Sequence, residues 1–132
     1  MNKLVVIAVS LLLLAGVGYL MTKVVGKPIS NDLSVIGKGK PVLVLIYENF
    51  SPTGGEALNR LSKVTNDYDS KVEFVVADLG IPKGRAFANR YQLIDGQAIF
   101  LKNNGQPSQV ISIPEDELEL RNLLDSMLAN LE

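Results

Sequence analysis

Residues 41–64 read PVLVLIYENFSPTGGEALNRLSKV, which predicts a strand, a polar turn and a helix in succession. The run Val42–Tyr47 is continuously apolar and rich in β-branched residues, as is typical of a strand covered on both faces. Leu58, Leu61 and Val64 then recur at the spacing of an amphipathic helix. A buried strand that leads through a short turn into a helix is a building unit of α/β domains.

The turn between this strand and this helix offers two helix caps. Thr53 and Glu56 fit a capping box, and Ser51 before Pro52 is the other candidate cap. We expect this loop to serve mainly as a cap. The functional alternative is a loop that binds a carboxylate or phosphate, because free N–H groups and the positive end of a helix dipole meet there. Catalysis by Ser51 is disfavoured because the chain has no His to act as its base.

The remaining pattern continues the alternation of strands and helices. The predicted elements are a strand at 72–77, a helix at 82–91, a strand at 98–101, a hairpin turn at 103–105, a strand at 110–113 and a helix opened by Pro114. Early strand–helix alternation favours parallel pairing through right-handed crossovers, and the hairpin then adds antiparallel strands. We predict a three-layer α/β/α sandwich with a mixed sheet over residues 41–132.

Composition excludes several chemistries. The chain has 132 residues, a net charge of −1, no Cys and no His. Disulfides, thiol redox chemistry, a Cys/His zinc site and a His general base are therefore absent. The even charge balance provides no electrostatic footprint for nucleic acid. We expect no catalytic residue, no cofactor and no metal.

The N-terminus carries a membrane signal. Residues 4–21 contain no charged side chain, and as a helix they would be about 27 Å long, close to the hydrocarbon thickness of a bilayer. We predict a single-pass signal-anchor over residues 1–24 that contacts the bilayer through residues 4–21, followed by a juxtamembrane linker over 25–40. A cleaved signal peptide is the alternative, although only Gly16 and Gly18 suit a cleavage site.

The side of the membrane is less directly encoded. Counting Lys and Arg alone favours a domain that stays inside, because Lys23, Lys27, Lys38 and Lys40 come after the apolar run. The very short lead before Lys3 is instead typical of a segment that exports the domain behind it. We predict that the domain lies on the exported side of a membrane.

The order of elements is that of the thioredoxin fold, and local sequence agrees with it. KPVLV at 40–44 resembles the start of the central thioredoxin strand, and RYQL at 90–93 resembles the Lys-Tyr-Gly-Ile stretch before the active-site proline loop. NNG at 103–105 resembles the Lys-Asn-Gly turn. The chain is thus similar to the thioredoxin-like family over about residues 39–132.

The same alignment shows where the chain departs from that family. Ser51 and Gly54 fall at the two thiol positions of Cys-x-x-Cys, Leu45 at the buried acid, and Gln97 at the cis-proline. Without a proline there, a cis bond would cost about 3 kcal/mol. The resemblance therefore implies a degenerate, redox-inactive member of the family.

These observations predict a membrane-anchored, redox-inactive domain that acts as a protein-interaction, assembly or accessory subunit of a membrane-associated complex. The expected binding residues form the degenerate active-site loop: Phe50, Ser51, Pro52, Thr53, Gly54 and Gln97. Strand addition at the edge near Gln97 is one expected mode.

Two other functions are consistent with the sequence. One is a small-ligand binder or non-redox enzyme that uses a strand-end crevice around Glu48, Ser51 and Asp78. The other is a structural subunit whose transmembrane helix binds while the domain only caps a larger complex.

Overall fold

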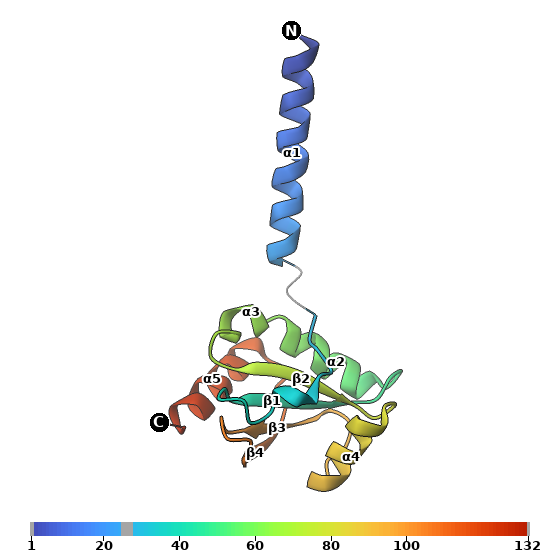
Figure 1. Cartoon of the computed structure of the whole chain (residues 1–132), viewed down its shortest axis with the longest axis vertical. Coiled ribbons are helices and arrows are strands. Elements are labelled where there is room, and N and C mark those ends of the chain that lie inside the picture. The colour runs from blue at the N-terminus through green and yellow to red at the C-terminus, as the bar shows by residue number, and fades with distance from the viewer. Residues whose placement is uncertain (1, 25–27, 132) are drawn as a thin grey trace.

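The computed structural model describes residues 2–24 and 28–131 (Figure 1). Its elements in chain order are α1 (Lys3–Val24), the 3₁₀ helix η1 (Leu33–Val35), β1 (Val42–Tyr47), α2 (Pro52–Ser62), α3 (Thr65–Tyr68), β2 (Glu73–Asp78), α4 (Pro82–Tyr91), β3 (Gln97–Leu101), β4 (Pro107–Ser112) and α5 (Glu117–Ala129). The bounds of β1 and α4 are those predicted from the sequence.

The four strands form one mixed sheet in the order β2-β1-β3-β4. β1 and β2 are parallel, whereas β3 runs antiparallel to both of its neighbours, β1 and β4. The prediction of an α/β fold with a mixed sheet is confirmed. This topology makes β1 and β3 interior strands and leaves β4 as an edge strand.

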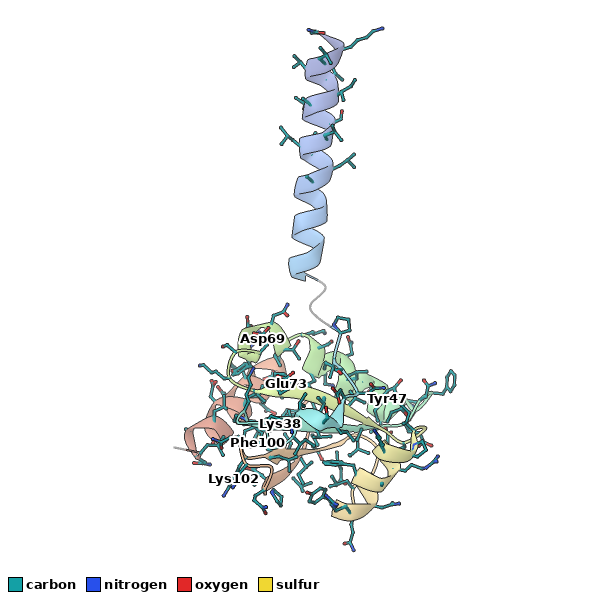
Figure 2. The ribbon with its side chains drawn as sticks, in the orientation of Figure 1. Lys38, Tyr47, Asp69, Glu73, Phe100 and Lys102 are labelled. Atoms are coloured by element: carbon teal, nitrogen blue, oxygen red, sulfur yellow. The ribbon has the colours of Figure 1, made fainter. Side chains whose placement is uncertain are left out.

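Two hydrophobic clusters lie on opposite faces of the sheet. Leu43, Leu45 and Phe100 face α2, α3 and α5 in the first cluster (Figure 2 labels Phe100). Val42 and Val44 face α4 and the η1 segment in the second cluster. All residues of β1 but the last are fully buried, which explains its unbroken apolar run, because alternate side chains enter different cores.

Residues 28–40 lie against the domain, although their composition predicts a linker. Ser30 forms an isolated parallel bridge with Val75 of β2, and the Val76 N–H donates to the Ser30 carbonyl at 2.8 Å. Leu33 and Ile36 pack on the second cluster. Burial of these apolar side chains outweighs the flexible composition of the segment. The predicted linker residues 25–27 lie outside the described residues.

α1 is a separate helix at the N-terminus in Figure 1. Its described large apolar side chains are all about half or more exposed, with Leu4 and Leu12 at 73%. Counted over the residues that the structure describes, no helix has both the length and the apolar character needed to cross a membrane.

α2 and α5 begin or end at other residues than the sequence predicts. The helical spacing from Leu58 to Tyr68 is divided between α2 and the short α3. The last helix begins at Glu117 rather than just after Pro114, because Asp116 is the N-cap and its side chain accepts from the Leu118 N–H at 3.4 Å.

Candidate functional site

The loop between β1 and α2 is held by a carboxylate from another part of the chain. Asp95 precedes β3, and its two oxygens accept three hydrogen bonds. They come from the Glu48 N–H at 2.7 Å, the Ser51 hydroxyl at 2.5 Å and the Gly54 N–H at 3.1 Å. One acidic side chain thus joins the end of β1, the entry to α2 and the first turn of that helix.

This arrangement corrects the predicted helix caps. Ser51 occupies the N-cap position of α2, but its side chain makes no cap hydrogen bond and donates to Asp95 instead. The capping box is not formed either, because Glu56 pairs with Arg60 at 3.2 Å. Asp95 takes the role of the cap from a distance, since it accepts the otherwise free N–H of Gly54.

Gly54 is glycine because the Asp95 carboxylate lies where a side chain would begin. Gly54 is buried, and a Cβ built on it would overlap Asp95 Oδ1. The neighbouring Gly55 has open space around the same position. The second thiol position of the thioredoxin motif is therefore filled by the carboxylate of another loop, and the predicted anion site is occupied by the chain itself.

The loop at residues 94–97 is closed by two hydrogen bonds within the loop and one to β1. The Ile94 N–H donates to Gln97 Oε1 at 3.0 Å, the Gln97 N–H to the Ile94 carbonyl at 3.1 Å and the Gly96 N–H to the Ile46 carbonyl at 2.9 Å. No peptide bond is cis among the residues that the structure describes. Because these donors are used and β3 is interior, strand addition at Gln97 has no free edge to use.

Two large apolar side chains remain exposed beside these closed loops. Phe50 is 95% exposed and Ile94 is 67% exposed. Phe50 also has a φ of +66°, a conformation that is strained for a bulky residue without αL preference. Pro52 and Thr53 are exposed at the start of α2. The accessible part of the predicted loop is therefore its apolar tip, whereas Ser51 and Gly54 are held by hydrogen bonds to Asp95.

A shallow groove of about 490 Å³ continues from Ile94 and Asp95 toward α4. Leu79, Ala88 and Leu93 contribute apolar surface to it. Its polar lining residues are Glu48, Arg85, Asn89 and Asp95. The groove opens beside the exposed Ile94, so an apolar surface and a polar rim adjoin each other at this end of the sheet.

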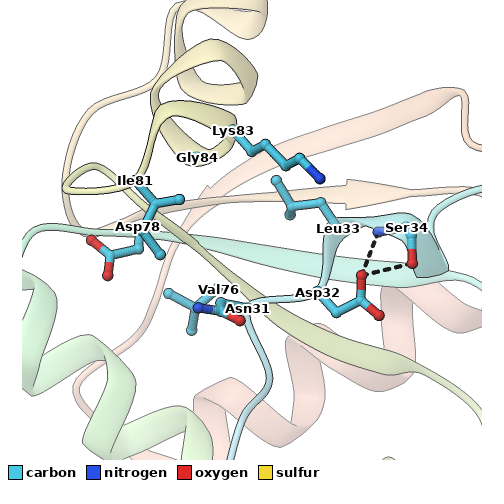
Figure 3. A pocket seen from close by; sticks show the side chains of 9 residues that line it. All are labelled: Asn31, Asp32, Leu33, Ser34, Val76, Asp78, Ile81, Lys83 and Gly84. Carbon is cyan, nitrogen blue, oxygen red and sulfur yellow. Dashed lines mark hydrogen bonds between the residues drawn. The ribbon is translucent and has the colours of Figure 1, made fainter.

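In the part of the chain that the structure describes, the predicted crevice of Glu48, Ser51 and Asp78 is divided between separate places. Glu48 lines the groove beside Ile94, whereas Asp78 lines a different cavity of about 310 Å³ (Figure 3). Asp78 Oδ1 accepts the Gly80 N–H at 2.8 Å, so its carboxylate stabilises the turn after β2. Within the described residues, no group of three or more acidic side chains is placed to hold a metal ion.

The cavity in Figure 3 is formed partly by the segment at residues 31–34. There, Asp32 accepts from the Ser34 hydroxyl at 2.6 Å and from the Ser34 N–H at 3.0 Å. The hydroxyl bond, followed by the backbone bond, lowers the pKa of Asp32 below its ordinary value. Asp32 is thus a cap for η1, and its lowered pKa keeps it ionised near neutral pH.

Two residues of the site were not singled out from the sequence. Asp95 is followed by Gly96, a pair that is typical of a turn and carries no signal of a contact with residue 54. Ile94 is a single apolar residue in a loop, and its exposure depends on how the loop folds. The pairing of β1 with β3 is what brings Asp95 to the Phe50 loop, and Ile94 is the residue before it in the chain.

Comparison with known proteins identifies the fold. No family model and no curated protein matches the chain. Among solved structures, an uncharacterised thioredoxin-like protein from Clostridium perfringens matches with a TM-score of 0.64 and 20% identity, over 76% of this chain and 81% of that one. The germline-specific thioredoxin Deadhead of Drosophila melanogaster matches with a TM-score of 0.57 and 18% identity, over 69% and 84%.

Fasciola hepatica thioredoxin gives a similar result, with a TM-score of 0.56 and 18% identity, over 68% of this chain and 83% of that one. At these identities the likeness concerns the fold. Together with the absence of cysteine, it fits a redox-inactive domain. The chain is a cysteine-free protein with the thioredoxin-like fold.

Proposed function

We propose that this chain is a membrane-tethered interaction module that binds a protein partner through the surface of Phe50, Pro52, Thr53 and Ile94. We call this surface the tip. In this proposal the domain has no catalytic residue, cofactor or metal. It serves as an assembly or accessory subunit of a membrane-associated complex.

The observation that carries the proposal is the state of Phe50. A large aromatic side chain that is 95% exposed gains almost nothing from burial within the domain. Its positive φ adds a cost to the folded state. Strained and exposed aromatic residues are characteristic of binding surfaces, because a partner can supply the burial that the domain lacks.

The tied half of the loop supports this role. Asp95 holds Ser51 and Gly54 in place, so Phe50 projects from a loop that is fixed on one side. A fixed loop loses little conformational entropy when it binds, which favours affinity. The absence of thiols and the buried Leu45 at the family's acid position agree with a scaffold that does not exchange disulfides.

The tether belongs to the same proposal. The uncharged run at residues 4–21 and the exposed apolar side chains of α1 up to Leu14 favour contact with lipid. A tether would raise the effective concentration of the tip near a partner in the same membrane. In this proposal the domain lies on the exported side of the membrane.

The test is to compare the proteins that full-length variants capture. Tagged full-length protein would be solubilised in mild detergent, and the proteins that co-purify would be identified for the parent, for Phe50→Asn and for Val110→Asn. Val110 is a matched control because it is an exposed apolar residue on the edge strand β4. We expect a stoichiometric membrane partner with the parent and with Val110→Asn, and its loss with Phe50→Asn.

Three outcomes would contradict the proposal. A partner that remains with Phe50→Asn would show that the tip does not bind it. Retention of the partner by a fragment that contains only residues 1–27 would instead support the alternative in which the helix alone binds. A parent protein that purifies with no partner would move the search to small ligands of the groove beside Ile94.

A further inference from the structure

A second groove, of about 410 Å³, lies between η1 and α4, away from the tip. Leu33 and Ile36 line one side, and Phe87 and Tyr91 of α4 line the other. The two aromatic rings are in tilted contact, with centroids 5.0 Å apart. We call this the α4 groove.

The α4 groove exists because this face of the sheet has little helical cover. The opposite face is covered by α2, α3 and α5, whereas this face has α4 and the three-residue η1 segment. One short turn cannot fill the space beside a ten-residue helix. The side chains of the groove are therefore half-buried by their own chain and still accessible from outside.

The rim of the α4 groove is basic. Lys83 and Arg90 line it, and α4 carries a third cation, Arg85, but no acid. Among the described residues, none of these three cations has a carboxylate within ion-pair distance, although Asp32 interacts with Lys83 at longer range. An apolar floor with cations at its edge suits an apolar side chain flanked by carboxylates.

The chain itself carries such a group at the start of α5. Leu118 is 63% exposed and stands between Glu117 and Glu119. Glu115 and Asp116 precede it, so four acids surround one exposed leucine. Acids in a first helical turn are explained by the helix dipole, but the exposed leucine among them is not. We call this group the Leu118 knob.

We propose that the Leu118 knob of one copy of this chain docks into the α4 groove of a second copy. The apolar side chain would lie against Phe87 and Tyr91, and Glu119 would approach Arg90. α4 and α5 lie on opposite faces of the sheet (Figure 1). One contact therefore leaves a free knob on one copy and a free groove on the other, and the association is head-to-tail.

The contact area is small, so the affinity in free solution is expected to be weak. Confinement of copies in one membrane would raise their effective concentration. Lys38 and Lys102 are labelled in Figure 2. Their backbone adjoins the Gly105 end of the groove, since the Gly39 N–H donates to the Asn103 carbonyl at 3.1 Å and the Gly105 N–H donates to the Lys102 carbonyl at 2.8 Å.

The test uses the absence of cysteine as a clean background. Two differently tagged full-length proteins, Ala86→Cys in the groove and Asn122→Cys beside the knob, would be mixed in detergent and oxidised. Asn122 is exposed and lies one helical turn after Leu118, so this variant keeps the Leu118 knob intact. The matched control replaces Asn122→Cys with Asn130→Cys, an exposed residue at the other end of α5. We expect the mixed disulfide to form about tenfold more with Asn122→Cys, as specific docking requires.

A charge exchange then tests the rim. Arg90→Glu in the Ala86→Cys chain is expected to lower the cross-link about tenfold, and Glu119→Arg in the Asn122→Cys chain to restore it. Circular dichroism would verify that each variant is folded. Equal yields with Asn122→Cys and Asn130→Cys would overturn the proposal and indicate association through α1. A cross-link yield that is the same with and without Arg90→Glu would also overturn the proposal.

Discussion

Phe50 and Ser51 are adjacent in the chain, but Phe50 is exposed and strained whereas Ser51 is held by a hydrogen bond. Phe50 is almost fully exposed and has a positive φ, so its conformation costs free energy that the domain does not recover. Ser51 and Gly54 are held by the carboxylate of Asp95, so this half of the loop gains hydrogen bonds. One loop therefore contains a strained contact surface and a rigid support, separated by a single peptide bond.

This contrast shows how a site without reactive groups keeps a defined shape. In a protein that exchanges disulfides, the chemistry at these positions needs sulfur. Here the two positions are Ser51, which carries a hydroxyl, and Gly54, which has no side chain. The carboxylate of Asp95 occupies the space between them. If the Asp95 hydrogen bonds and the exposed Phe50 have separate roles, mutations at Gly54 and Asp95 should change stability, and mutation of Phe50 should change partner binding.

The largest expected effect is at Gly54. Gly54→Ala places a methyl group inside the Asp95 carboxylate, and we expect a loss of about 2–3 kcal/mol in the free energy of unfolding, as for overpacking. Gly55→Ala is the matched control. Its Cβ meets open space, so we expect a gain of about 0.5–1 kcal/mol from helix propensity. Urea unfolding of the full chain in detergent, monitored by tyrosine fluorescence, measures both.

Asp95→Ala is expected to have the next largest effect. It leaves three donors without their acceptor, which should lower the free energy of unfolding by about 2 kcal/mol. The combination with Gly54→Ala is the sharper measurement, because the methyl group no longer meets a carboxylate. We expect the cost of Gly54→Ala to fall by more than about 1 kcal/mol in this background. Strict additivity would show that Asp95 does not restrain Gly54.

Phe50→Asn should change stability in the opposite direction. Asn tolerates a positive φ better than Phe does, so we expect a gain of up to about 1 kcal/mol together with loss of the partner. Gln92→Asn is the control, because Gln92 also has a positive φ, of +55°, at the end of α4. It should stabilise the fold and leave partner binding unchanged. Loss of stability with Phe50→Asn would show that Phe50 packs within the domain.

Ser51→Ala should have the smallest effect. It removes one hydrogen bond to Asp95 at a partly exposed site, and we expect a cost of about 0.5–1 kcal/mol in unfolding experiments. Co-purification of the partner should be unchanged, because the hydroxyl points to Asp95 and not to the tip. A lost partner with retained stability would assign Ser51 to the contact surface instead.

Prediction from the sequence succeeded where the signal was local and periodic. The apolar run of β1 and the pattern of α4 correspond to elements with the predicted bounds, because burial on two faces or on one helical stripe leaves a mark in consecutive residues. The mixed sheet was predictable from the order of these elements. Residues 28–40 were harder, since four spaced apolar residues in a segment with glycines do not show that the segment packs.

The class of fold and the chemistry that the chain lacks could be read from the residues alone, because periodicity and the absence of Cys and His are properties of the sequence. Which part of the loop is closed and which is accessible depends on the folded chain. Asp95 is more than forty residues from Ser51 and Gly54, and a hydrogen bond over that separation exists only after β1 and β3 pair. Phe50 and Ile94 remain exposed in the folded chain. Their exposure depends on which residues pack around them, and the order of residues in the chain does not specify this.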